Sequence, residues 1–256
     1  MKKIVTIQDI SCFGKCSLTV ALPIISAMGI ETAVIPTAVL STHTGSGFTG
    51  YTFHDLSGDI TSISEHWKKL GLEFDAIYTG YLGSDSQIQI MSDFFDDFGK
   101  DDNFIVVDPV LGDSGKLYAG FTDKFISEMK RLCAKADYIL PNMTEASFLL
   151  DIPYIENCNE DSAKEVLRRL TELGCKTPIL TGVRSGELHG AAAYDSERNE
   201  FYFSYSKHIE GLQKALDMSV KYISDCIEVT MPCLDEMWYG NCFELCLDKL
   251  IGYVKE

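Results

Sequence analysis

Short apolar runs alternate with longer amphipathic stretches along most of the chain. Residues 104–107 are apolar and largely β-branched, which is typical of a buried strand. Residues 161–173 repeat apolar positions at helical spacing and are followed by Gly174, which favours a helix that ends there. Strands that alternate with helices predict a mostly parallel sheet with helices on both faces. The predicted strands are residues 3–7, 32–37, 76–79, 104–107, 138–140 and 178–181, and the predicted helices are 18–28, 62–70, 86–98, 122–134, 144–150 and 161–173.

The last part of the chain has a different pattern. Residues 191–194 and 200–205 are separated by a polar stretch at residues 195–199, which predicts a late antiparallel hairpin. Two helices, at residues 212–227 and 234–254, are expected to finish the chain. Because no repeat or linker interrupts the pattern, we predict one domain over residues 1–256.

Charge narrows the range of partners. The chain has 22 Lys and Arg against 38 Asp and Glu, a formal net charge of -16. Nucleic acids and anionic membranes bind to basic surfaces, so neither is expected as a partner. The net charge does not exclude an anionic nucleotide, which needs only a local positive potential. The nine cysteines are scattered, which suits reduced thiols, and no apolar run reaches spanning length. We therefore expect a cytoplasmic protein.

Two acids follow the predicted strand at residues 104–107. Asp108 precedes Pro109, and Asp113 lies among glycines that let the backbone turn sharply. The carboxyl ends of strands in open α/β sheets bind ligands, and acids there suit a hydrated Mg²⁺ and phosphate oxygens. The alternative is that both acids only form turns.

Asn142 and Glu145 follow the strand at residues 138–140 and open the next helix. Asn at the helix start with Glu three residues on is close to a capping box, which needs no function. In the functional interpretation, Glu145 holds Mg²⁺ and Asn142 faces nucleotide phosphates at the helix N-terminus. Both interpretations stay open at this point.

Three further segments carry polar or aromatic groups near predicted strand ends. Thr181 and Gly182 could offer a hydroxyl and a backbone amide to a phosphate, or form an ordinary strand exit. His43 and Thr44 lie in a Ser-, Thr- and Gly-rich segment that could close over a small polar substrate or be a plain loop. Tyr81 could stack on a flat ring, or belong to the core.

In combination these segments resemble the vitamin B6 kinases, the pyridoxal and pyridoxamine kinases of the ribokinase-like family. The resemblance runs in order from residue 3 to about residue 206, and the related hydroxymethylpyrimidine kinases carry a Gly-Ser-Asp and glycine-rich start that is missing here. It rests on Ser41-Thr42-His43-Thr44-Gly45, Gly80-Tyr81-Leu82-Gly83-Ser84, Asp108 to Asp113 with Gly115 and Tyr118, Asn142 with Glu145, and Thr181-Gly182.

The resemblance implies a three-layer αβα fold and an activity. ATP with Mg²⁺, and in some members a monovalent cation, would phosphorylate the 5′-hydroxyl of pyridoxal, pyridoxamine or pyridoxine in the salvage of pyridoxal phosphate. Members of this family often form homodimers, so a monomer and a homodimer both stay open for this chain.

The resemblance also implies roles for single residues. Asp108 and Asp113 would be catalytic, and Asp108 and Glu145 would hold the metal. Asp108, Asn142, Glu145, Thr181 and Gly182 would bind the nucleotide, and Asp9, His43, Thr44 and Tyr81 would bind the substrate.

Asp9 departs from the resemblance, which implies a serine at the end of the first strand. A carboxylate near the vitamer could pair with a pyridinium nitrogen, the hydroxyl or an amine. We therefore expect Asp9 to shift substrate preference toward pyridoxamine.

A Gly-x-Gly-Asp segment, which supplies the anion hole and the general base in the family, is missing around residues 206–212. Either the natural protein has this segment and the printed sequence lacks it, or the chain is a non-catalytic relative that binds vitamer or nucleotide. We favour the first explanation, since deleting a helix between buried elements would unsettle the core. A hydroxymethylpyrimidine kinase is the alternative enzyme.

Overall fold

The computed structural model describes residues 2–44, 48–186, 188–205, 212–233 and 242–255. Within these ranges nine strands form one sheet. They are β1 (Lys3–Ser11), β2 (Glu31–Leu40), β3 (Phe53–Asp55), β4 (Ala76–Thr79), β5 (Phe104–Val107), β8 (Tyr138–Ile139), β9 (Thr177–Ser185), β10 (Leu188–Asp195) and β11 (Glu200–Ser204).

The sheet is mostly parallel. Its strand order is β11-β10-β9-β8-β5-β4-β1-β2-β3. The run from β2 to β9 is parallel throughout, whereas β3 at one edge and β10 and β11 at the other are antiparallel to their neighbours. This topology confirms the predicted parallel sheet with a late antiparallel hairpin. The parallel strands end at one edge of the sheet, and that edge is where ligand sites form in such folds.

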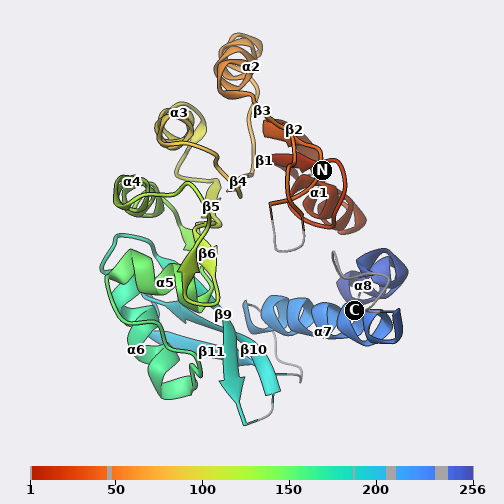
Figure 1. Cartoon of the computed structure of the whole chain (residues 1–256), viewed down its shortest axis with the longest axis vertical. Coiled ribbons are helices and arrows are strands. Elements are labelled where there is room, and N and C mark those ends of the chain that lie inside the picture. The colour runs from red at the N-terminus through yellow and green to blue at the C-terminus, as the bar shows by residue number, and fades with distance from the viewer. Residues whose placement is uncertain (1, 45–47, 187, 206–211, 234–241, 256) are drawn as a thin grey trace.

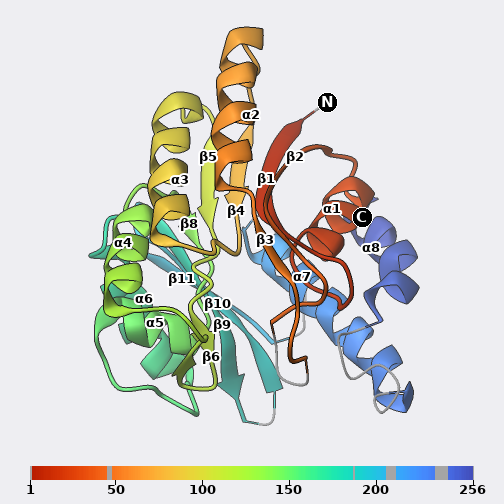
Figure 2. The ribbon, with the colours of Figure 1, turned by 45° about the horizontal axis from the view of Figure 1, so that its top comes forward.

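Helices cover both faces of the sheet. On one side lie α2 to α6, and on the other lie α1, α7 and α8 (Figures 1 and 2). This arrangement confirms the three-layer αβα fold. The helices are α1 (Leu18–Ala27), α2 (Ser57–Leu70), α3 (Asp85–Phe98), α4 (Asp123–Cys133), α5 (Met143–Leu150), α6 (Glu160–Thr171), α7 (Leu212–Thr230) and α8 (Leu247–Lys255).

Side-chain caps fix where several helices begin. The side chains of Ser84, Thr122 and Asn159 each accept a hydrogen bond from a backbone N–H in the first turn of α3, α4 and α6. Such bonds satisfy donors that the helix itself leaves open. They explain why the predicted starts of these helices lie within one residue of the observed ones.

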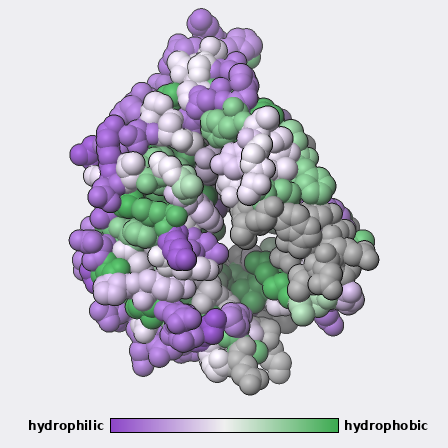
Figure 3. Space-filling view, in the orientation of Figure 1, coloured by the Kyte–Doolittle hydropathy of each residue, from purple (hydrophilic) through white to green (hydrophobic). Residues whose placement is uncertain are grey.

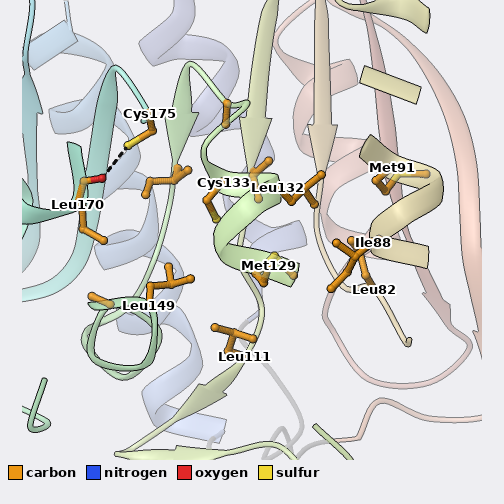
Figure 4. Packing of buried hydrophobic residues seen from close by; sticks show 14 of the residues in the cluster. Leu82, Ile88, Met91, Leu111, Met129, Leu132, Cys133, Leu149, Leu170 and Cys175 are labelled. Atoms are coloured by element: carbon orange, nitrogen blue, oxygen red, sulfur yellow. Dashed lines mark hydrogen bonds between the residues drawn. The ribbon is translucent and has the colours of Figure 1, made fainter. Parts of the chain in front are cut away.

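The main core lies between the sheet and the α2–α6 layer. Met91 of α3 and Met129 and Leu132 of α4 point into this core, and none is more than 1% exposed (Figure 4). The Cys175 thiol donates to the Leu170 carbonyl oxygen at 3.5 Å, which ties the end of α6 to the start of the strand that follows. A second cluster joins α7 and α8 and packs against α1.

The structure corrects the last predicted helix. Residues 234–241 lie outside the described part, and Cys242 has a ψ of 55°, through which no helix can run. The Cys242 N–H donates to the hydroxyl of Thr230 at 2.7 Å, and a short 3₁₀ helix (Phe243–Cys246) follows. The regular helix α8 therefore begins only at Leu247. No helix in the described ranges has both the length and the apolar character needed to cross a bilayer.

Core packing gives a first prediction. Replacing Met129 with Ala should lower the free energy of unfolding by about 2–5 kcal/mol, because a cavity remains where the side chain was. The matched control is Met231→Ala, since Met231 is 59% exposed and should cost little. Denaturant midpoints of the two variants measure the difference, and equal midpoints would contradict the placement of α4 against the sheet.

Candidate active site

A cavity of about 280 Å³ lies at the carboxyl ends of β1, β2, β4 and β5. The face seen in Figure 1 is hollowed near its centre (Figure 3). All four residues predicted to bind the substrate line this one cavity, although they come from three separate parts of the chain. The cavity is lined by Asp9, Ser11, Cys16, Ser17, Leu40, His43, Thr44, Tyr81, Val110 and Tyr118.

Asp9 lies at an irregular point of β1. The register of β1 against β2 shifts between Gln8 and Ile10, and such irregularities re-aim a side chain. Asp9 is only 4% exposed, and its Oδ2 accepts a hydrogen bond from Ser11 Oγ at 2.8 Å. The site therefore presents a buried carboxylate to whatever occupies the cavity.

His43 is held by a close backbone approach. Gly14 has a φ of +102°, and a Cβ on it would stand 2.2 Å from His43 Cδ2, so this position requires glycine. The backbone N–H of His43 donates to the Phe13 carbonyl oxygen at 3.2 Å. The imidazole stands edge-on to the Phe48 ring, with the two ring centroids 4.6 Å apart. These contacts place the His43 side chain on the cavity wall, while the next residue, Thr44, is exposed.

Tyr81 follows β4 and is half-buried. Its ring stacks on Phe121 with centroids 6.1 Å apart. Burial raises the pKa of Tyr81 to about 12, and the charges of Asp9 and Asp55 add to the effect. Tyr81 is thus a neutral, fixed aromatic surface, of the kind on which a flat ring can stack.

Asp108 and Glu145 form a pair of carboxyl groups beside the cavity, and of the two Glu145 is buried and Asp108 is half-buried. Burial raises the pKa of Asp108, and burial together with the nearby Asp108 raises that of Glu145. Every ion pair between described residues uses other carboxylates. Two buried like charges hold a proton or attract a cation.

The N-terminus of α5 fixes the Glu145 carboxylate. Its Oε2 accepts from the Asn142 N–H at 2.8 Å and its Oε1 from the Leu111 N–H at 3.3 Å. Asn142 Oδ1 accepts in return from the Glu145 N–H, so the capping box is complete. Asn142 Nδ2 donates to the Gly112 carbonyl oxygen, so the structural interpretation of Asn142 is confirmed and its nucleotide role stays a prediction.

Asp113 lies on a small hairpin, β6 (Gly112–Asp113) with β7 (Lys116–Leu117), that the sequence pattern did not predict. Ser114 and Gly115 form its tip with φ of 50° and 76°, which fits a two-residue hairpin turn. The hairpin docks on α5, since the Gly115 N–H donates to the hydroxyl of Thr144 at 2.9 Å. Asp113 is exposed on this hairpin and is not part of the Asp108–Glu145 acid pair.

Tyr118 connects the cavity with the acids. It lines the cavity, and burial raises its pKa to about 12, with Glu145, Asp113 and Asp108 adding to the shift. The three acids are therefore within electrostatic reach of one cavity wall.

The predicted strand exit at Thr181 is wrong. β9 continues to Ser185, and its register against β10 shifts between Gly190 and Ala191, opposite Gly182. Gly182 has a φ of 77°, which lets the strand bulge and keep its pairing. The Thr181 N–H donates to the Pro141 carbonyl oxygen at 3.0 Å, so Thr181 lies beside the segment that carries Asn142. Their shared role toward a nucleotide stays a prediction.

The acid pair of Asp108 and Glu145 fits a divalent cation. No group of three or more metal-ligating side chains occurs within the described ranges. Mg²⁺ often binds through one or two carboxylates and completes its shell with water and substrate phosphates. Asp108 and Glu145, with no opposing cation among described residues, are the side chains that would hold it.

Several residues that line the cavity were not predicted from the sequence. Ser11 and Leu40 are the last residues of β1 and β2, Cys16 and Ser17 lie between β1 and α1, and Val110 follows β5. Burial raises the pKa of the Cys16 thiol, which keeps it protonated. Their position just past strand ends was the available signal, but small or apolar side chains carry no distinctive chemistry.

Solved structures share this fold over nearly the whole chain. The pyridoxal kinase of Lactobacillus plantarum is 27% identical with a TM-score of 0.87, and the match covers 98% of this chain and 97% of that chain. A phosphomethylpyrimidine kinase candidate from Bacteroides thetaiotaomicron VPI-5482 is 37% identical with a TM-score of 0.88, covering 100% of this chain and 94% of that one. Fold and site thus place the chain in the class of α/β proteins that includes these kinases.

The family described as phosphomethylpyrimidine kinase matches residues 22–215. The chain belongs to this family. Among curated relatives, a candidate pyridoxal kinase of Schizosaccharomyces pombe is 31% identical over 169 residues, which are 62% of this chain and 46% of that protein. The matches span between 30% and 60% of the curated relatives' own length.

The raised pKa values of the acid pair predict a pH dependence of stability. Without a cation, the folded protein holds protons on these groups that the unfolded chain releases above about pH 4, so its unfolding free energy should fall between about pH 5 and pH 8. Added Mg²⁺ should restore stability near pH 8, where both groups bind it deprotonated.

Glu145→Gln tests this prediction, because a Gln side chain can keep the capping bond from Asn142 but carries no charge. This variant should show a flatter pH curve and a weaker response to Mg²⁺ in denaturant unfolding. The control is Glu165→Gln on the exposed face of α6, which should behave like the wild type. If the unfolding free energy of Glu145→Gln changes with pH as steeply as that of the wild type, the acid pair is not the cause of the pH dependence.

Proposed function

We propose that the protein is a kinase that transfers the γ-phosphoryl group of ATP to the 5′-hydroxyl of a B6 vitamer. The observation that carries this proposal is the cavity lined by Asp9, His43, Thr44 and Tyr81 next to the Asp108–Glu145 acid pair. A flat, polar ring suits the first group of residues, and metal-bound phosphates suit the second.

The comparisons support the substrate class. The Bacteroides thetaiotaomicron relative has also been solved in an orthorhombic form with pyridoxal, with 37% identity and a TM-score of 0.85 to this chain. The Lactobacillus plantarum relative is a pyridoxal kinase. Since the described cavity lies at the carboxyl edge of the same fold, a B6 vitamer is the substrate that we assign to it.

Each side of the site has its own part in the proposed reaction. The Tyr81 ring would stack on the pyridine ring, and His43 and Thr44 would contact its polar edge. Bound Mg²⁺ would neutralise charge on the phosphates, and Asp108 and Glu145 would hold it. The bond from the γ-phosphorus to the ADP oxygen would break as the vitamer oxygen bonds to phosphorus and gives its proton to a general base. Such reactions depend on positioning and charge stabilisation.

The general base and the anion hole are the unassigned parts of this proposal. In the resemblance they come from a Gly-x-Gly-Asp segment, expected around residues 206–212, and residues 206–211 lie outside the described part of the chain. Asp113 is proposed to assist at the phosphates from its exposed place on the hairpin. Thr181, Gly182 and Asn142 are proposed to contact the nucleotide.

A second candidate is a hydroxymethylpyrimidine kinase. The family match favours it, because that family is described as phosphomethylpyrimidine kinase. An aminopyrimidine alcohol is also flat and polar, and would stack on Tyr81 in the same way. A non-catalytic protein that binds vitamer or nucleotide is the third candidate. The cytoplasmic location, a role in salvage, a monovalent cation and a homodimer stay predictions from the sequence.

Turnover and intact mass together separate these candidates. We expect ATP- and Mg²⁺-dependent phosphorylation of at least one B6 vitamer, with hydroxymethylpyrimidine a poorer substrate in the same panel. We also expect the protein made from its natural gene to be heavier than the 28.5 kDa of the printed sequence, by about a turn and a helix. A mass of 28.5 kDa with binding but no turnover would identify the non-catalytic relative.

Asp9 gives a prediction on substrate ranking. A buried carboxylate attracts the ammonium of pyridoxamine more than the aldehyde of pyridoxal. Asp9→Ser should therefore lower kcat/KM for pyridoxamine relative to pyridoxal by about tenfold, the loss expected for one charged hydrogen bond. Asp101→Ser at an exposed turn is the control. An unchanged ranking of the three vitamers in Asp9→Ser would show that Asp9 does not discriminate between the ammonium of pyridoxamine and the aldehyde of pyridoxal.

A further inference from the structure

Gln87 is a fully buried polar side chain outside the cavity. It lies in the first turn of α3 and is 0% exposed. Its Oε1 accepts from the Gly83 N–H at 2.8 Å, and its Nε2 donates to the Thr37 carbonyl oxygen at 2.8 Å and to Asp55 Oδ2 at 3.3 Å. One amide thus joins the loop after β4 to β2 and β3.

The partners of Gln87 define which way its amide points. Gly83 offers only a backbone donor, and the Thr37 carbonyl is only an acceptor, so the two ends of the amide cannot be exchanged. A glutamate at position 87 would face this carbonyl and the Asp55 carboxylate without a proton to donate. The site is therefore built for an amide, and an apolar side chain would leave the Gly83 N–H without its partner.

The loop that Gln87 holds carries Tyr81. The Tyr81 carbonyl oxygen accepts from the hydroxyl of Thr37 at 3.0 Å, and Gly80 N–H donates to the Ile7 carbonyl oxygen at 3.0 Å. Gly83 is also confined on its other side, because a Cβ on it would meet Phe53 at 3.0 Å. The backbone on both sides of Tyr81 is fixed by bonds from β1, β2 and α3.

We propose that Gln87 is a positioning residue for Tyr81. Its amide fixes the loop from Gly80 to Ser84 against β2 and β3, and this sets where the Tyr81 ring stands in the substrate cavity. The part of this proposal that concerns substrate rests on the proposed function, whereas the fixing of the loop does not. Gln87 itself does not line the cavity, so it acts only through the loop.

A double-mutant cycle tests the coupling. Gln87→Met should raise the KM for the vitamer about tenfold with kcat changed less than about threefold, because it weakens ground-state binding through Tyr81. In a protein that already carries Tyr81→Ala, the same change should alter KM by less than about twofold. Equal effects in both backgrounds would mean that Gln87 only stabilises the fold, and would overturn the proposal.

Thr37→Val is the second route to the same result. It removes the bond to the Tyr81 carbonyl oxygen with little change of volume, and should give the same KM-specific loss if Gln87→Met folds poorly. The matched control is Gln89→Met on the same helix, because Gln89 is exposed and its side chain donates to Asp93 Oδ1 on the same helix. Gln89→Met should leave KM, kcat and the melting temperature unchanged.

Amide hydrogen exchange separates this proposal from the kinase assignment. The Gly83 amide should exchange at least about tenfold faster in Gln87→Met than in the wild type and Gln89→Met, whether or not the protein turns over a vitamer. Unchanged Gly83 exchange would overturn the proposal even in an active kinase. Faster exchange in a protein without vitamer binding or turnover would reject the proposed function alone and leave the loop-fixing role of Gln87 standing.

Discussion

The placement of Asp108 near the buried Glu145 is the constraint on which the rest of the site depends. Desolvation raises the cost of ionising each carboxyl group, and the nearby Asp108 adds to that cost for Glu145. The surrounding backbone stabilises the pair, because the Glu145 carboxyl group accepts hydrogen bonds from the backbone N–H groups of Asn142 and Leu111. Gly112 permits the close hairpin approach beside them, because a Cβ there would stand 2.1 Å from the Lys116 carbonyl oxygen.

The same constraint connects the acidity of the chain with the proposed use of ATP. A protein of net charge -16 repels a nucleotide that arrives without a counter-ion. No Lys or Arg is among the residues that line the described cavity. A nucleotide that brings a divalent cation presents opposite charge to Asp108 and Glu145, so attraction replaces repulsion where the phosphates would lie. In the proposed reaction, the acid pair would thus favour the metal complex over the free nucleotide.

The sequence predicted best those features that depend on neighbours along the chain. The bounds of β4 and β5 agree with the prediction to the residue, because apolar runs between turn signals are local patterns. The capping box at Asn142 and Glu145 was also legible, since both partners lie within one turn. The four residues of the predicted substrate site line one cavity because parallel strands end at the same edge of the sheet.

What could not be predicted depends on pairing between distant segments. β3 forms only because Phe53–Asp55 meets the edge of β2, and no signal within its three residues requires a strand. The bulge at Gly182 depends on β10, and without that partner Thr181 and Gly182 resemble a strand exit. Gln87 is a similar case, because its importance comes from partners 32 and 50 residues away.

The two interpretations of Glu145, as a helix cap and as a metal ligand, do not exclude each other. A carboxylate has about four lone-pair sites, and the hydrogen bonds from the backbone N–H groups of Asn142 and Leu111 use two of them. These bonds hold both oxygens in place before any ligand arrives, which lowers the cost of ordering the group on binding. The cap is therefore the means by which the fold orients the carboxylate, and the structural role of Glu145 is a condition of its proposed chemical one.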